Sequence, residues 1–163
     1  MNKAQKLLFT FIYAAINTLL ELKVDLNNKL EVTEKFDLIT CTEVIEHLEN
    51  PRLFLREIEK ITAHGGKIIM TTPNPYSFLS LLSYTIKGYH SSFGPKDYPA
   101  HISPLSPYQL TNMISEIHGL SIEKLSYIPN GRIPGTGIRY TKLLPFLTGK
   151  RFSDNYCCVI RKS

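Results

Sequence analysis

The fold of this chain is decided by residues 36–72, which read FDLITCTEVIEHLENPRLFLREIEKITAHGGKIIMTT. The apolar runs Phe36–Cys41 and Lys67–Thr72 each predict a strand that is covered on both faces. Between them, an Asn-Pro pair followed by apolar residues at helical spacing predicts a helix over residues 51–63. We therefore expect the two runs to be adjacent parallel strands, joined through that helix as the crossover.

The remaining segments extend this pattern into a single domain over residues 1–163. The uncharged residues 7–20 predict an apolar helix over about residues 4–22. In the division of the domain, residues 1–21 are assigned to this apolar helix. At ~1.5 Å per residue, 14 residues would extend about 21 Å, less than the ~30 Å core of a bilayer. We therefore expect this helix to be buried or to lie on a membrane surface. Further along, the sequence predicts a helix at 76–89, a loop at 88–107, a helix at 108–119, a strand at 120–128, an irregular basic segment at 130–149 and a strand at 155–162.

The composition is that of an ordinary globular chain with a positive charge. The formal net charge is +5 and the pI about 9.1, which favours an acidic substrate, nucleic acid or an anionic membrane surface. Because the basic residues are scattered, the sequence does not favour binding to nucleic acid. The three cysteines, Cys41, Cys157 and Cys158, have no CxxC spacing, which argues against disulfides or a zinc site and predicts the cytoplasm.

Three ionisable residues follow the first predicted strand. Glu43, Glu46 and His47 stand at i, i+3 and i+4, and Thr42 before them is a residue type that caps helices. At that spacing the three side chains would share one face of a helix. Two carboxylates and an imidazole there can hold a divalent ion or act as a general base. The position is also where open α/β sheets bind ligands, beyond the carboxyl ends of the strands.

The order of these motifs resembles the class I S-adenosylmethionine (SAM)-dependent methyltransferases. FDLITCTEVIEHLENP followed by GGKIIMTTPNP is similar to the family's strand 4 through strand 5. HISPLSPYQLTNMISEIHGLSIEKL is similar to a later helix with strand 6, and NYCCVIRK to strand 7. The resemblance covers about residues 22–163 and is greatest to small-molecule O-methyltransferases of the ubiquinone-biosynthesis type. It implies a Rossmann-like α/β fold: a doubly wound, mostly parallel sheet with helices on both faces, truncated at its N-terminal side, with an antiparallel last strand.

The resemblance also implies a function. SAM would be the cofactor, and its methyl group would go to an oxygen, or a nitrogen, of a small-molecule acceptor. Glu43, Glu46 and His47 would be the catalytic residues, which take or orient the acceptor proton. The family's strand 4 ends beside the cofactor, which assigns Cys41 and Thr42 to cofactor binding. Asp25 would correspond to the acidic residue near the adenine, and a solvated turn aspartate is the alternative.

A metal site is a further implication. The ExxEH pattern matches residue types that hold a divalent metal such as magnesium in ubiquinone-pathway O-methyltransferases. It also resembles the small-RNA 2′-O-methyltransferases, in which a second histidine from a later loop completes the site; His101 corresponds to it here. The metal ligands would then be Glu43, Glu46, His47 and His101. The alternative is that the pattern caps a helix and is structural.

The chain departs from the family at the glycine-rich loop that binds the methionine end of SAM. No glycine precedes Phe36, so the backbone donors of that loop have no counterpart there. A complementary chain that carries the GxGxG loop could supply it. The alternatives are a non-catalytic, truncated methyltransferase-like module that packs against a partner or a membrane surface through residues 7–20, and an RNA-directed 2′-O-methyltransferase. The expected location is the cytoplasm, with or without membrane association.

Overall fold

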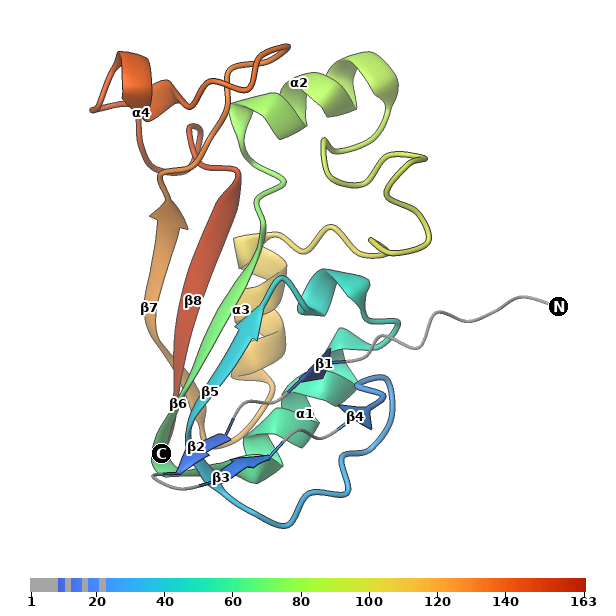
Figure 1. Cartoon of the computed structure of the whole chain (residues 1–163), viewed down its shortest axis with the longest axis vertical. Coiled ribbons are helices and arrows are strands. Elements are labelled where there is room, and N and C mark those ends of the chain that lie inside the picture. Colours follow the sequence, from blue (N-terminus) through green and yellow to red (C-terminus); the bar gives the residue numbers. More distant parts are fainter. Residues whose placement is uncertain (1–8, 11–12, 16–17, 21–22) are drawn as a thin grey trace, which may run out of the picture.

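A four-stranded mixed sheet is the centre of the fold in the computed structural model, which describes residues 9–10, 13–15, 18–20 and 23–163 (Figure 1). The strand order is β5-β6-β8-β7. The strands are β5 (Phe36–Thr42), β6 (Thr62–Pro73), β7 (Leu120–Ile128) and β8 (Asn155–Lys162). β5 and β6 are parallel, whereas β8 is antiparallel to both β6 and β7. The predicted α/β class and the antiparallel last strand are therefore confirmed.

The crossover from β5 to β6 is the predicted one. Helix α1 (Pro51–Ile61) begins at the N-cap Asn50, whose side chain accepts a hydrogen bond from the Leu53 backbone N–H at 3.0 Å. Pro51 occupies the first helical position, where its missing N–H costs nothing. The buried stripe of α1 includes Phe54, which packs in the core against the sheet.

Four further helical segments complete the described chain. They are the 3₁₀ helix η1 (Ile45–His47) and the α-helices α2 (Phe78–Lys87), α3 (Pro107–Ser115) and α4 (Tyr140–Leu143). Helix α2 and helix α4 lie beyond the carboxyl end of β6, at the opposite end of the sheet from the C-terminus (Figure 1). The predicted loop between α2 and α3 and the irregular segment around α4 are both present.

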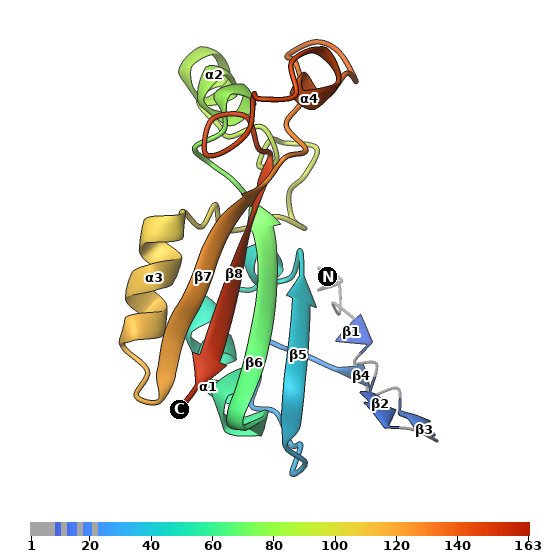
Figure 2. The ribbon, with the colours of Figure 1, turned by 90° about the vertical axis from the view of Figure 1, so that its left-hand side faces the viewer.

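Helices α1 and α3 cover the same face of the sheet. The connections β5-α1-β6 and β6-α3-β7 both advance the chain in one direction across the sheet, and right-handed crossovers then place both helices on one side. Figure 2 shows both helices on that side. On the other face, Leu38 is 57% exposed and Thr40 is exposed. The expected second layer of helices is not formed by the described residues.

The N-terminal segment differs from its prediction. Its described parts form two small antiparallel pairs in place of a helix. They are β1 (Phe9–Thr10) with β4 (Lys23–Val24), and β2 (Tyr13–Ala15) with β3 (Thr18–Leu20). A largely apolar, uncharged run such as residues 7–20 carries no clear helical period, and its aromatic and β-branched residues also favour strands. The rest of the predicted helix at 4–22 lies outside the described residues. Across the described ranges, no helix has the length and apolar character needed to cross a bilayer.

The N-terminus of α3 offers a test of local stability. The Ser106 hydroxyl accepts from the Gln109 N–H at 3.2 Å, and the Gln109 side chain accepts from the Ser106 N–H at 2.9 Å. Because Ser106→Ala leaves one of these donors without its partner, we expect the free energy of unfolding to fall by about 1 kcal/mol. Urea denaturation measures it. Thr111→Ala, at an exposed position within α3, is the matched control and should not destabilise. Equal losses in both variants would contradict the capping role.

Candidate active site

The residues after β5 do not continue into the predicted helix. Thr42 is the last residue of β5, and Glu43 adopts a positive φ of 51°, a conformation that L-residues rarely take. The short helix η1 then begins after Val44, which makes no side-chain capping bond. The prediction that Thr42 caps a helix with Glu43, Glu46 and His47 on one face is therefore wrong. The Glu43 N–H instead donates to the Thr71 carbonyl of β6 at 3.0 Å, which holds the turn in place.

Glu43 binds side chains of the neighbouring strands. Its Oε1 accepts from the Thr71 hydroxyl at 2.9 Å, and its Oε2 accepts from the Asn155 amide at 2.6 Å. The side-chain oxygen Oδ1 of Asn155 accepts in turn from the side-chain Nδ2 of Asn130 at 2.7 Å. Glu43 thus connects the carboxyl ends of β5 and β6 to the start of β8. No sequence pattern predicts this contact of Asn155, because 112 residues separate it from Glu43.

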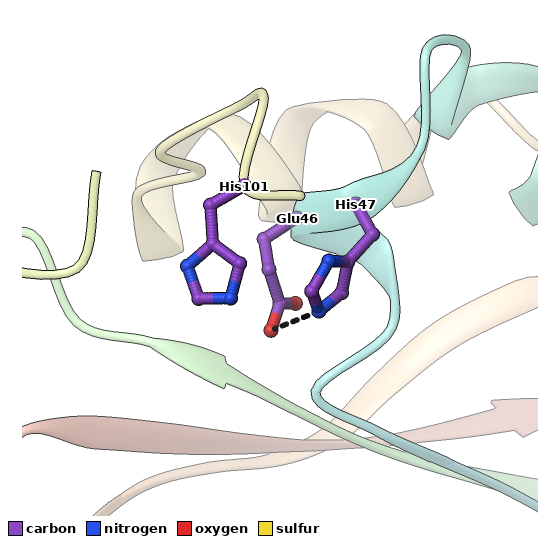
Figure 3. Close-up of side chains that lie close together, drawn as sticks. All are labelled: Glu46, His47 and His101. Carbon is purple, nitrogen blue, oxygen red and sulfur yellow. Dashed lines mark ion pairs between the residues drawn. The ribbon is translucent and has the colours of Figure 1, made fainter. Parts of the chain in front are cut away.

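Glu46, His47 and His101 form one compact cluster (Figure 3). One possible ligand atom from each lies within 4.8 Å of the others. Glu46 is fully buried; its Oε2 accepts from the Thr72 hydroxyl at 2.9 Å, and its Oε1 has no hydrogen-bond partner within the described part of the chain. That Oε1 lies 3.8 Å from His47 Nε2, and the two imidazole rings meet edge to face at 4.5 Å.

Backbone carbonyls fix the tautomers of both histidines. His47 Nδ1 lies 2.8 Å from the Ala100 carbonyl, and His101 Nδ1 lies 2.6 Å from the Ser92 carbonyl. Because a carbonyl oxygen can only accept, both Nδ1 atoms must carry the proton in these bonds. In the neutral rings, each Nε2 then keeps a free lone pair. The cluster therefore offers two imidazole lone pairs and one free carboxylate oxygen.

Burial determines the charge of the cluster. Desolvation raises the pKa of Glu46 to about 7, although hydrogen bonds from its own backbone and from Thr72 act in the opposite direction. Desolvation also lowers the pKa of His47, against the effect of the Ala100 carbonyl. Around pH 7, Glu46 is thus divided between its two forms and His47 is mainly neutral. Glu46 is therefore close to the point at which it can accept or release a proton, and neutral His47 is in the form that accepts one.

The loop between α2 and α3 is fixed directly over η1. The backbone N–H groups of Ile102 and Ser103 both donate to the Glu46 carbonyl, at 2.9 and 3.1 Å. Phe93 from the same loop packs against the His101 ring at 5.4 Å. The loop therefore brings His101 to the cluster, as predicted, whereas Glu43 lies outside the cluster and acts on it only at longer range.

The residues predicted for cofactor binding lie in three different settings. The Asp25 carboxylate accepts from the Asn27 backbone at 3.0 Å and from the Asn28 side chain at 3.1 Å, within its own turn. The Cys41 side chain is buried in the core, which raises the pKa of its thiol to about 12, so only its backbone could face a ligand. Thr42 is exposed at the end of β5.

Comparison with known proteins gives a consistent result. Residues 10–125 match a family described as "Methyltransferase domain". The chain is 27% identical over 127 residues to the ubiquinone biosynthesis O-methyltransferase of Aeromonas salmonicida, a match that covers 77% of this chain and 49% of that protein. The chain thus spans about half the length of this relative.

Solved structures share the fold at low identity. A possible histamine N-methyltransferase from Thermotoga maritima superposes with a TM-score of 0.59 at 18% identity, over 86% of this chain and 62% of the other. A SAM-dependent methyltransferase from Mesorhizobium loti gives a TM-score of 0.55 at 14% identity, over 85% and 67%.

Proposed function

Because this chain belongs to the class I SAM-dependent methyltransferase family, we propose that it takes part in methyl transfer from SAM to an oxygen, or a nitrogen, of a small-molecule acceptor. The name of the Aeromonas relative, an O-methyltransferase of ubiquinone biosynthesis, supports oxygen as the acceptor atom. The cluster of Glu46, His47 and His101 lies at the carboxyl end of the parallel strands, which is the usual ligand-binding edge of such sheets.

One observation carries the proposal: the free Glu46 Oε1, 3.8 Å from His47 Nε2. A buried carboxyl oxygen without a hydrogen bond is costly, and it is retained where a ligand or a charged partner uses it. The His47 imidazole, which is 17% exposed and mainly neutral, can accept the acceptor's proton. Ionised Glu46 beneath it would stabilise the imidazolium that forms.

The chain's own groups would act on the acceptor. SAM, when bound, supplies an electrophilic methyl group on its sulfonium sulfur. His47 would accept the acceptor's proton, and His101 would hold the acceptor oxygen in line with the methyl group. The new oxygen–carbon bond would replace the methyl–sulfur bond, and S-adenosylhomocysteine would be the leaving group. Glu43 is a positioning residue, since both its carboxylate oxygens already accept hydrogen bonds from Thr71 and Asn155.

A divalent metal is the second use that this cluster supports. A carboxylate oxygen and two Nε2 lone pairs form a ligand set, and histidines that bind metals commonly donate Nδ1–H to backbone carbonyls, as both do here. Two nitrogen ligands suit Zn²⁺ or Mn²⁺ better than Mg²⁺, which prefers oxygen. Glu43 lies outside this set.

The open side of the sheet supports a role for a complementary chain. β5 pairs only with β6 in the described part of the chain, and Leu38 on its uncovered face is 57% exposed. A polypeptide with a GxGxG loop that adds a strand here would cover this edge and supply the missing cofactor contacts. A non-catalytic module that packs against a partner through the same face is the second candidate. The three free cysteines support a cytoplasmic location.

Calorimetry with SAM tests whether this chain needs a complementary chain to bind the cofactor. No glycine precedes Phe36 to bring backbone donors to the methionine carboxylate, so we expect this chain alone to bind SAM with a Kd weaker than about 1 mM. Micromolar binding would contradict the need for a complement. Transfer of labelled methyl groups from SAM to catechol, with and without any adjacent gene product that carries a GxGxG loop, tests the reaction. Transfer that persists unchanged in His47→Gln would contradict the assigned base.

A further inference from the structure

The positive charge of this chain is concentrated at one end of the fold. Residues 76–100 and 129–154, which contain α2 and α4, carry seven basic residues and two acidic residues, Asp97 and Asp154. These two segments therefore hold a charge of +5, which equals the formal net charge of the whole chain. This end attracts anions as a whole.

A pocket of about 240 Å³ lies within this basic end, where α2 and residues 89–91 meet residues 132–136. Its lining includes Ser83, Lys87, Tyr89, Ser91, Arg132 and Thr136. None of the lining residues is an aspartate or a glutamate. The pocket is separate from the cluster of Glu46, His47 and His101, none of which contributes to its lining.

The polar lining consists mainly of hydrogen-bond donors that are not in use. Lys87 makes no ion pair, and the Ser83 and Ser91 hydroxyls make no hydrogen bond, to any residue that the structure describes. Arg132 uses its Nε, which donates to Asp154 Oδ2 at 2.7 Å. Its two terminal NH₂ groups have no partner among the described residues. The Thr136 hydroxyl is already engaged with the backbone of Ile133 and Ile138.

We propose that this pocket binds a phosphate group. Phosphate offers several acceptor oxygens and no obligatory donor, which matches an ammonium, a guanidinium and two free hydroxyls. The volume is below the ~300 Å³ at which pockets for drug-sized ligands begin, so the pocket suits a single charged group of a larger molecule. The inference does not rest on the proposed methyl transfer.

The same phosphate chemistry has two possible sources. It can belong to a soluble molecule, or to the headgroup of an anionic lipid. Exposed apolar side chains lie on the elements beside the pocket, Tyr84 and Ile86 on α2 and Leu143 on α4, and they could contact the apolar part of a lipid. Phosphate binding could also affect the cluster of Glu46, His47 and His101. Ser91 lines the pocket, and the carbonyl of the next residue, Ser92, accepts the hydrogen bond from His101.

Titration of the full chain with inorganic phosphate at constant ionic strength, followed by ³¹P NMR, tests the pocket. We expect saturable binding that Lys87→Gln weakens at least about tenfold, because a direct charge-assisted contact is lost. Arg132→Gln should have a similar effect. Lys142→Gln is the matched control: it removes the same charge from the same end of the fold, on α4 outside the pocket, and should weaken binding less than about twofold.

Sedimentation with vesicles separates the two sources. Vesicles of phosphatidylglycerol that bind the chain in a Lys87-dependent way, with phosphatidylcholine vesicles inactive, indicate a lipid headgroup. Saturable binding of inorganic phosphate without vesicle binding indicates a soluble ligand. The proposal is overturned if neither probe binds, or if Lys142→Gln weakens binding as much as Lys87→Gln. Circular dichroism at each step verifies that the variants are folded.

Discussion

Glu46→Gln is expected to raise the free energy of unfolding by about 3 kcal/mol at pH 8 and to leave it unchanged at pH 4. Burial raises the pKa of Glu46 to about 7, from an ordinary value of 4.5. Below pH 4.5 the folded and unfolded forms are both protonated, and the residue costs nothing. As the pH rises from 4.5 to 7, the unfolded form ionises first, so the fold loses up to about 1.4 kcal/mol of stability per pH unit, or about 3 kcal/mol in all. Glutamine keeps the neutral shape and still accepts from Thr72, so the variant avoids that loss.

Urea denaturation in the presence of a chelator, at pH 4, 6 and 8, measures this difference. The neighbouring residues His47, His101 and Glu43 are present in both proteins, so the difference between the two proteins reports the Glu46 carboxyl. Glu57→Gln is the matched control. The hydrogen bond from Lys60 is the main cause that lowers the pKa of Glu57, so this variant should be less stable than the natural chain at pH 8. If Glu46→Gln also loses stability at pH 8, the ionised carboxylate stabilises the fold, and the expected cost of burying it is absent.

Zn²⁺ or Mn²⁺ is expected to raise the melting temperature of the natural chain and to lose this effect in His101→Ala. A ligand that binds only the folded form adds about 2.7 kcal/mol at 100 times its Kd. Removing one of three ligands should weaken metal binding about 100-fold and thereby abolish most of that gain. Thermal denaturation with and without each metal is the measurement. His118→Ala, which removes an exposed histidine outside the cluster, should respond as the natural chain does.

Two results would contradict the metal site. The first is an equal loss in His118→Ala and His101→Ala, which would indicate non-specific binding to surface histidines. The second is the absence of any stabilisation by either ion. In that case the two imidazoles and the carboxyl would act in proton transfer alone, as the proposed methyl transfer requires.

The sequence predicted the part of the fold in which local signals agree. The two apolar runs and the Asn-Pro helix start between them each specify one element, and together they specified β5, α1 and β6. Residues 4–22 gave no such agreement: their largely apolar, uncharged centre carries no helical period, and its described parts are strands.

The site was predictable only in part. Glu46 and His47 were found from their spacing after a strand, and His101 came from the family resemblance, because its place depends on a loop that the spacing cannot position. Glu43 lies outside the cluster, although it was predicted to share a helical face with Glu46 and His47. Its positive φ and its bond to Asn155 arise from the packing of distant strands, which helical spacing does not contain.

The position of β8 has a consequence for synthesis in the cell. β8 lies between β6 and β7, although it follows both in the chain, and it provides all the hydrogen-bonded pairing between β7 and the rest of the sheet. Until residue 162 has been made and exposed, β7 has no strand to pair with, and the inner edge of β6 is open. The nascent chain therefore presents two unpaired strands to ribosome-associated chaperones. A ribosome that stalls before Asn155 would release a product that can complete neither edge.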